Sequence, residues 1–423
     1  MVVVFMLCSL AFGLIVDREW LDRRRVMCVG VFLWSVATAA AGLAQNLWQL
    51  VLFRSLVGVG EASYAVVAGP MLVDFYPPHE RTIVFAIYAL AGPIGGAIGY
   101  LLGAVLSDIY GWRAAFAIVG VPGVVVALSV LCLEDPPRGI NDDLEEKDSS
   151  ASGLCRDLAS IVSNPHWAVS TIGQVTMCFA IGGMSDWGPS WLQRYHRVPL
   201  KEVGIMGGGI TAVAGIVGNL LGAKTTQALA PSVPNAGFLA SGAFAALGGL
   251  VGAAALNVNA QGRTHLIYVM LLAQQTCMFA FMAPMGAICM SAIPVELRGR
   301  SNGIQILLTH ILGDVISPPI IGAVSDRTGS LTYGMQLIWV SVAITGASWL
   351  AGFLVLPPLA LAPPPGGKGA KQVSMRSVLC GQGVAVDSSD EASTSQEEDE
   401  AGTDTNASDE YTNTDESDSH DNP

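Results

Sequence analysis

Two ionisable residues stand inside an otherwise apolar segment at about residues 48–76. Arg54 and Glu61 are seven positions apart, which places them on one face of a helix, two turns from each other. An ionisable side chain at mid-membrane costs roughly 2.5–3.5 kcal/mol on insertion scales, so such residues usually face a cavity or a partner. One interpretation is a proton-titrating carboxylate at Glu61, with Arg54 as its counter-charge or as a ligand for an anionic headgroup. The alternative is an ion pair that only packs the helices together.

A second polar group lies near the end of the apolar part of the chain. His310 and Asp314 are four positions apart and Ser317 follows three positions later, so a regular helix would carry all three on one face. They are either hydrogen-bonding partners in helix packing or a polar stripe that lines a cavity opposite Arg54 and Glu61. The sequence alone favours neither interpretation.

A third set of charged residues follows the first apolar run. Gly13 is followed by three residues, by Asp17 and Arg18, and then by the basic run Arg23-Arg24-Arg25. A carboxylate at a helix end can pair with arginine and with the N-terminus of a neighbouring helix, and such a network must break when two halves of a protein move apart. We therefore expect a charge-locked gate here. The alternative is that these charges only orient the chain in a membrane.

An internal repeat points to further gate residues. Glu80-Arg81 precedes an apolar run that ends in Gly103-Ala104-Val105-Leu106-Ser107-Asp108, and Glu296-Leu297-Arg298 precedes one that ends in Gly322-Ala323-Val324-Ser325-Asp326. We expect Glu80 and Arg81 to belong to the gate. Asp186 stands before a Gly188-Pro189 break at the outer end of another run, which is either a flexible gate or only a place where Trp187 anchors the helix at the membrane interface.

The elements that must position these residues are long apolar helices. Of the 423 residues, 52% are hydrophobic and 13% are charged, against about a quarter charged in soluble domains. Backbone polar groups cannot stay unpaired in lipid, so apolar runs of about 20 residues must be helices. Eleven such runs are predicted, at about residues 2–16, 26–45, 48–76, 82–106, 113–133, 166–190, 203–229, 236–257, 264–292, 302–322 and 333–357.

The repeat and the charges predict how these helices are organised. We expect an N-terminal transmembrane half (1–133, five helices), a cytoplasmic central loop (134–165), a C-terminal half (166–357, six helices) and a disordered acidic cytoplasmic tail (358–423). Placing residues 17–25 in the cytoplasm puts fourteen Lys and Arg on that side and six on the other, as the positive-inside rule requires. Six plus six helices would need one more helix before residue 1, and we expect that the gene model or isoform lacks it.

Composition also excludes several classes of function. The net charge is −13, but residues 387–423 hold 14 Asp and Glu and no Lys or Arg, so the remainder is near neutral at −13 + 14 = +1. No basic stripe predicts nucleic-acid binding. The eight cysteines form no CxxC pair, and no motif for ATP hydrolysis, for a nucleophilic serine or for a metal is present. We therefore expect no enzyme activity, no cofactor and no metal.

The motifs around these residues resemble one transporter family. Arg54-Ser-Leu-Val-Gly58-Val-Gly60-Glu61-Ala62-Ser63-Tyr64 resembles a signature of the spinster family of lysolipid and sphingolipid transporters, within the major facilitator superfamily. Similar matches are Glu134-Asp135-Pro136-Pro137-Arg138-Gly139 and the segment from His310 to Gly322. The resemblance implies the major facilitator fold: all-α and polytopic, with 11 of the usual 12 transmembrane helices in two pseudo-symmetric halves.

The same resemblance implies a function. We expect a multi-pass secondary transporter in the endolysosomal or plasma membrane that moves lysophospholipid or sphingosine phosphate by alternating access, with protons as a candidate coupling ion. In the family, an acidic residue of the first helix is thought to work beside the carboxylate that corresponds to Glu61, and that helix has no counterpart here. Two alternatives stay open: a major facilitator for a small organic anion or sugar, and a truncated, non-transporting membrane interaction protein.

Overall fold

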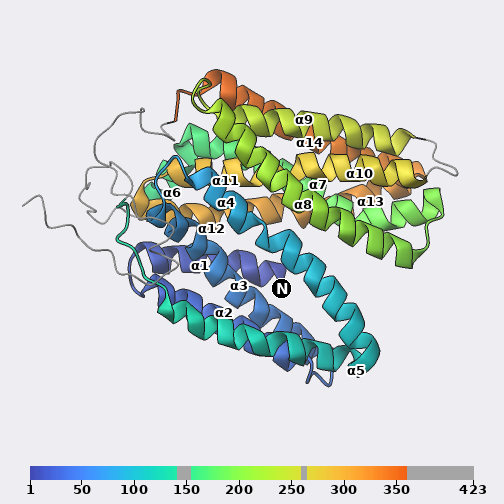
Figure 1. Ribbon diagram of the computed structural model, residues 1–423, viewed down its shortest axis with the longest axis horizontal. Coiled ribbons are helices and arrows are strands. Elements are labelled where there is room, and N and C mark those ends of the chain that lie inside the picture. Colours follow the sequence, from blue (N-terminus) through green and yellow to red (C-terminus); the bar gives the residue numbers. More distant parts are fainter. Residues whose placement is uncertain (141–153, 259–263, 360–423) are drawn as a thin grey trace, which may run out of the picture. The chain divides into compact units, whose positions relative to one another are not determined.

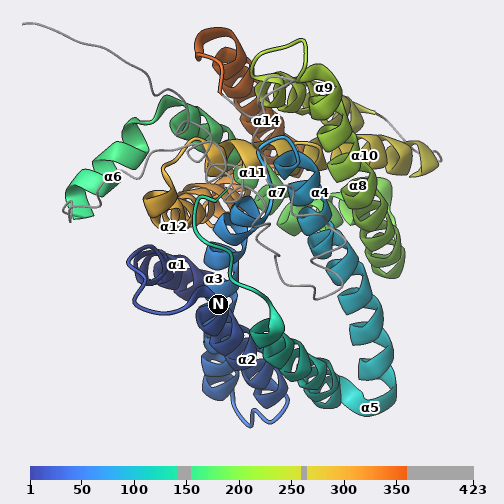
Figure 2. The same ribbon diagram turned by 60° about the vertical axis from the view of Figure 1, so that its left-hand side comes forward.

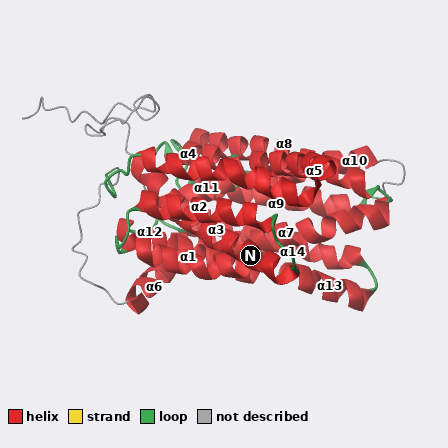
Figure 3. Cartoon of the chain, turned by 90° about the horizontal axis from the view of Figure 1, so that it is seen from below, coloured by secondary structure: helices red, strands yellow, loops and turns green. Residues whose placement is uncertain are grey.

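The protein is described by a computed structural model over residues 1–140, 154–258 and 264–359, and every regular element in these ranges is a helix (Figure 3). In this part of the chain, ten helical segments are long and apolar enough to cross a membrane. The first helix, α1 (Val2–Asp17), is equally apolar but shorter. The predicted all-α, polytopic architecture is therefore confirmed.

The first half is built around a long helix, α3 (Leu47–Phe75), that carries both Arg54 and Glu61. Asn46 caps the start of this helix, because its side chain accepts a hydrogen bond from the Gln49 backbone N–H. A break at Gly111, where φ is 81°, bends α5 sharply (Figure 1). The other elements of this half are α2 (Arg23–Ala41), α3 (Leu47–Phe75), α4 (Arg81–Ala89), α5 (Ala91–Ser129) and the 3₁₀ turn η1 (Val130–Cys132).

The segment expected to be a central loop contains a helix that we did not predict. This is α6 (Leu154–Ser163), which is too short to span a bilayer. Its apolar residues recur at helical spacing, and Leu158 and Ile161 pack against Trp167 and Ile293. The remainder of the predicted loop, at 141–153, and the predicted acidic tail from residue 360 onward lie outside the described residues.

The second half contains the larger apolar core. Its centre is formed by buried side chains such as Phe238, Met285, Ile338 and Trp349. The predicted run 302–322 is not one regular helix, because a π-helical turn, η3, interrupts it. The elements are α7 (Pro165–His196), α8 (Leu200–Leu229), α9 (Ala236–Asn257), α10 (Thr264–Phe279), α11 (Met282–Ser291), η2 (Val295–Leu297), α12 (Arg298–Thr309), η3 (His310–Asp314), α13 (Ser317–Thr328) and α14 (Leu331–Val355).

The two halves meet along a small number of helix pairs. Helix α1 packs against α12, α4 packs against α11 and α8, and α5 packs against α8. Figures 1 and 2 show the first half in blue to teal and the second half in green to orange, and these helices lie where the two halves face each other. Several of the predicted site residues lie in these helices, so they can respond to relative movement of the halves.

Candidate functional site

Arg54 and Glu61 lie on α3 as predicted, but they do not form an ion pair. Both residues are partly buried. Among the described residues, no ion pair within 4.0 Å joins them, although Glu61 is within electrostatic range of both Arg54 and His310. The purely structural ion pair considered from the sequence is therefore absent in this conformation, and both charged groups are available for other partners.

Two tyrosines meet one turn after Glu61. Tyr64 follows Glu61 by one helical turn, and its ring centroid lies 6.1 Å from that of Tyr88 on α4. On the other side, Gly58 lets α1 approach closely, because a Cβ there would stand 2.7 Å from the backbone oxygen of Met1. The neighbours of Glu61 on α3 therefore contact α1 at Gly58 and α4 at Tyr64.

His310 and Asp314 come together at the π-helical turn η3. His310 Nδ1 and Asp314 Oδ2 are 2.9 Å apart, and both side chains remain partly exposed. The other carboxylate oxygen, Oδ1, is buried without a hydrogen-bond partner among the described residues. The His310 ring also meets Phe5 of α1 edge-on, with centroids 5.3 Å apart. Because π-helical turns are frequent at functional sites, this junction between the halves is a candidate site.

Ser317 does not join the stripe that the sequence spacing suggested. Its side chain is fully buried, and a Cβ built on Gly182 of α7 would stand 2.8 Å from its hydroxyl oxygen. Its hydroxyl donates a hydrogen bond to the backbone oxygen of Asp314 at 3.4 Å, and both Ser317 and Asp314 lie against Gly182. Ser317 is therefore a packing residue in this structure.

Asp17 is buried against the first turn of α12, in the other half. Its carboxylate accepts hydrogen bonds from the backbone N–H of Gly299 at 2.8 Å and of Arg300 at 2.7 Å. It also accepts one from Arg300 Nε at 3.0 Å, and its side chain is 2% exposed. An acidic group at a helix N-terminus is stabilised by the unpaired amides and the helix dipole. Asp17 thus ties the end of α1 to the start of α12.

Gly13 belongs to the same contact between α1 and α12. A Cβ at Gly13 would lie 2.8 Å from the backbone oxygen of Gly299. One turn earlier, Ser9 donates a hydrogen bond to the backbone oxygen of Gly303 at 3.2 Å. Residues 9, 13 and 17 therefore form one face of α1 that lies directly on the backbone of α12. Gly13 of α1, together with Gly299 and Gly303 of α12, permits the close approach.

Arg81 and Arg298 occupy equivalent positions in the repeat, and each contacts a residue of the opposite half. Arg81 donates to the carbonyl of Val73, eight residues earlier, and to Ser291 of the second half at 3.1 Å. Arg298 donates to the carbonyl of Met290, also eight residues earlier. It also lies 3.6 Å from the Asp74 carboxylate in the first half. Asp74 and Ser291 each precede the arginine of their own half by seven residues, so the repeat is also a structural symmetry.

Several charged residues that pair near Asp17, Arg81 and Arg298 were not predicted. Arg23 is 4% exposed and pairs with Asp74 and Asp135, each at 2.5 Å. Arg300 pairs with Asp17 and with Asp157 of α6. The internal repeat could have pointed to Asp74, because Asp74 and Ser291 occupy equivalent positions. The helical spacing of the apolar residues around Asp157 indicates helix α6, but no pattern in the sequence indicates that Asp157 contacts Arg300.

The remaining gate candidates lie apart from these buried contacts. Arg24 pairs at 3.2 Å with Asp22, whose side chain caps α2, and the hydrogen bond from Arg24 lowers the pKa of Asp22. Arg18 is exposed, and Glu80 is partly exposed, with its Oε1 atom 3.7 Å from His79 Nε2. Among the described residues, Asp186 is exposed with no hydrogen bond or ion pair to the other candidates.

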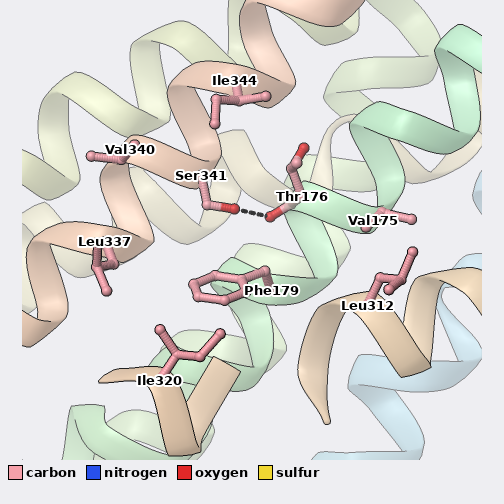
Figure 4. Close-up of a pocket in the computed structure, with 9 residues that line it drawn as sticks. All are labelled: Val175, Thr176, Phe179, Leu312, Ile320, Leu337, Val340, Ser341 and Ile344. Carbon is pink, nitrogen blue, oxygen red and sulfur yellow. Dashed lines mark hydrogen bonds between the residues drawn. The ribbon is translucent and has the colours of Figure 1, made fainter. Parts of the chain in front are cut away.

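A separate hollow lies beside η3 in the second half. It has a volume of about 260 Å³ and is bordered by α7, η3, α13 and α14. Ser341 donates a hydrogen bond to the backbone oxygen of Thr176, which leaves the wall almost wholly apolar (Figure 4). The lining residues are Val175, Thr176, Phe179, Leu312, Ile320, Leu337, Val340, Ser341 and Ile344. Leu312 belongs to the same π-helical turn as His310 and Asp314.

Comparison with known proteins places this arrangement in a family. Residues 1–318 match the model of the Major Facilitator Superfamily. The chain belongs to this superfamily. It is 30% identical over 341 residues to protein spinster homolog 1 of Xenopus laevis, which covers 76% of this chain and 64% of that protein. It is also 30% identical over 336 residues to protein spinster of Drosophila melanogaster, covering 77% of this chain and 54% of that protein. The resemblance to the spinster family is therefore confirmed, and the chain spans about two thirds or less of these relatives' length.

Solved structures of the superfamily share the fold. A bacterial homologue of the human lysosomal transporter Spinster, in an inward-facing and occupied conformation, superimposes with a TM-score of 0.55 at 20% identity. That match covers 86% of this chain and 89% of the other. The fucose:proton symporter of E. coli has a TM-score of 0.63 at 13% identity, covering 81% and 86%. Both confirm the major facilitator fold of the described helices.

Proposed function

We propose that this protein is a secondary transporter of the spinster type that works by alternating access. The observation that supports this most strongly is the connection between the halves at one end. Asp17, Arg81 and Arg298 each contact the opposite half through hydrogen bonds or charges. These contacts lie at the ends of helices, so they can break together when one half rotates against the other. The halves themselves, 1–133 and 166–357, are the moving bodies in this proposal.

The proposed substrate is a lysophospholipid or sphingosine phosphate. Such a molecule needs a cationic ligand for its headgroup and an apolar surface for its chain. Arg54 on α3 lies partly exposed and free of an ion pair with Glu61, which suits the first role. The apolar hollow beside η3 suits the second role, because its wall offers hydrocarbon contacts and few free polar groups.

The proposed coupling group is Glu61. Glu61 is within electrostatic range of Arg54 and His310, and a carboxylate near such charges can change protonation as its surroundings change. In this proposal, substrate binding or rocking of the halves alters the charges around Glu61 and so links proton uptake to transport.

Uptake by proteoliposomes tests both parts of the proposal. Labelled lysophosphatidylcholine and sphingosine phosphate are offered at several pH values to the protein and to its Glu61→Gln variant. We expect saturable uptake of at least one lipid, and we expect the variant to lose its pH dependence because glutamine cannot ionise. Asp22→Asn is the matched control, since Asp22 is a carboxylate outside the membrane that pairs only with Arg24 among the described residues.

Three results would change the proposal. Unaltered pH dependence in Glu61→Gln would remove this residue from coupling. Uptake of a sugar or a small organic anion instead of either lipid would replace the substrate class. Absence of uptake and of ligand-induced thermal stabilisation for every compound would favour the non-transporting membrane protein.

A further inference from the structure

Helix α6 places a second carboxylate on the arginine that binds Asp17. Asp157 Oδ2 accepts a short hydrogen bond from Arg300 Nη1, and the two side chains are only 5% and 9% exposed. The Nε atom of the same guanidinium donates to Asp17 at 3.0 Å. Arg300 is thus shared between a carboxylate of the first half and a carboxylate of the segment that links the halves.

Helix α6 is packed mainly on the second half. Leu158 and Ile161 contact a buried apolar cluster that contains Trp167 of α7 and Ile304 of α12. Leu10 of α1 borders the same cluster, but it is only partly buried. Asp157 and Arg300 are therefore carried by elements that pack together, whereas Asp17 belongs to the opposite half.

Separation of α1 from α12 would take Asp17 away from Arg300. Removing one partner of a buried ion pair is costly, because the remaining charge is left without compensation. Asp157 would stay with Arg300 and supply that compensation. While the halves are together, the two carboxylates on one guanidinium also repel each other, which weakens the hold of Arg300 on Asp17.

We propose that Asp157 is a positioning residue that keeps Arg300 neutralised when α1 leaves α12, and so favours opening of this end of the protein. The proposal rests on the alternation of the halves put forward above. It predicts a sign: loss of the Asp157 charge strengthens closure. A helix that merely braced the closed state would give the opposite sign, since its loss would loosen the contact.

Hydrogen–deuterium exchange of the full chain in phosphatidylcholine nanodiscs measures this sign directly, because local opening controls exchange. The amides to follow are those of residues 9–17 and 299–303. In Asp157→Asn we expect exchange of these amides about threefold slower than in the unchanged protein, an effect on the scale of a modest ion-pair contribution. In Asp17→Asn we expect faster exchange, because asparagine lacks the charge that pairs with Arg300 and keeps only one of the two acceptor oxygens. Asp22→Asn is the control for loss of a carboxylate at a helix end.

Each outcome has a defined meaning. Faster or unchanged exchange in Asp157→Asn, with faster exchange in Asp17→Asn, would overturn the role of Asp157 and leave the alternation intact. Unchanged exchange in Asp17→Asn would contradict the alternation itself at this contact. Unaltered exchange in α9 and α14 confirms that a variant is folded. Asp157→Glu keeps the charge, and it should restore exchange towards that of the unchanged protein if charge is what matters.

Discussion

At the scale of single residues, glycine determines how closely the two halves can approach. Gly13 lies directly on the backbone of α12, and a Cβ there would be 2.8 Å from a carbonyl oxygen that cannot rotate away. Gly95 on α5 has nothing within 4 Å of the equivalent position. Two glycines in helices of the same half thus differ only in what lies opposite them, which makes them a matched pair.

Gly13→Ala is expected to destabilise the protein by about 1–3 kcal/mol, the usual cost of overpacking a close contact. Gly95→Ala is expected to be neutral or stabilising, because alanine is favoured over glycine within a helix by roughly 0.5–1 kcal/mol. Thermal unfolding of both variants in detergent measures the difference. Equal unfolding temperatures would show that α1 does not lie on α12 as described.

At the scale of elements, most of the helices could be predicted from hydropathy, whereas the irregular elements could not. Long apolar runs reveal spans because lipid leaves the backbone no alternative to a helix. The turn η3 was missed because His310, Asp314 and Ser317 keep regular helical spacing in the sequence, and this spacing does not distinguish a π-helical turn from an α-helix. Helix α6 was missed because ten residues among charges resemble a loop.

The residues of the candidate site were predicted more completely than their partners. Types and spacing pointed to Asp17 and Arg81, since charges next to apolar runs are conspicuous. Their partners across the halves are backbone amides and a serine, at Gly299, Arg300 and Ser291, and hydropathy carries no information about such contacts. Asp157 could not be found because it depends on a tertiary contact of α6.

The hollow between α7, η3, α13 and α14 yields a prediction about chain length of the substrate. Val340→Trp should fill it, since Val340 lines the hollow and is 55% exposed. We expect uptake of long-chain lysolipid to fall several-fold while a short-chain analogue is less affected. Leu250→Trp on α9 is the control, because Leu250 is 71% exposed and does not line the hollow. Equal loss for both chain lengths would contradict a role for this hollow in holding the hydrocarbon chain.

At the scale of the whole molecule, the two halves contact each other at equivalent positions through groups of different charge. Arg298 lies 3.6 Å from the carboxylate of Asp74, whereas Arg81 donates a hydrogen bond to the neutral hydroxyl of Ser291. The conformational equilibrium of the protein should therefore respond to the charge at residue 291.

Ser291→Asp is expected to strengthen closure, because a carboxylate would then face the buried guanidinium of Arg81. We expect a higher unfolding temperature together with transport slowed by several-fold, since opening must now break a charged contact. Ser291→Asn retains a neutral hydrogen-bonding group and serves as the control. Faster transport in Ser291→Asp would contradict closure through this contact.

The unequal pair at residues 74 and 291 also bears on ancestry. If the halves descend from one duplicated gene, their ancestor had the same residue at both places, and the two copies have since diverged. Asp74 now serves Arg23, Arg298 and the Gly139 backbone together. The copies have consequently become dependent on each other, and neither half could be exchanged for a second copy of its counterpart without rebuilding these contacts.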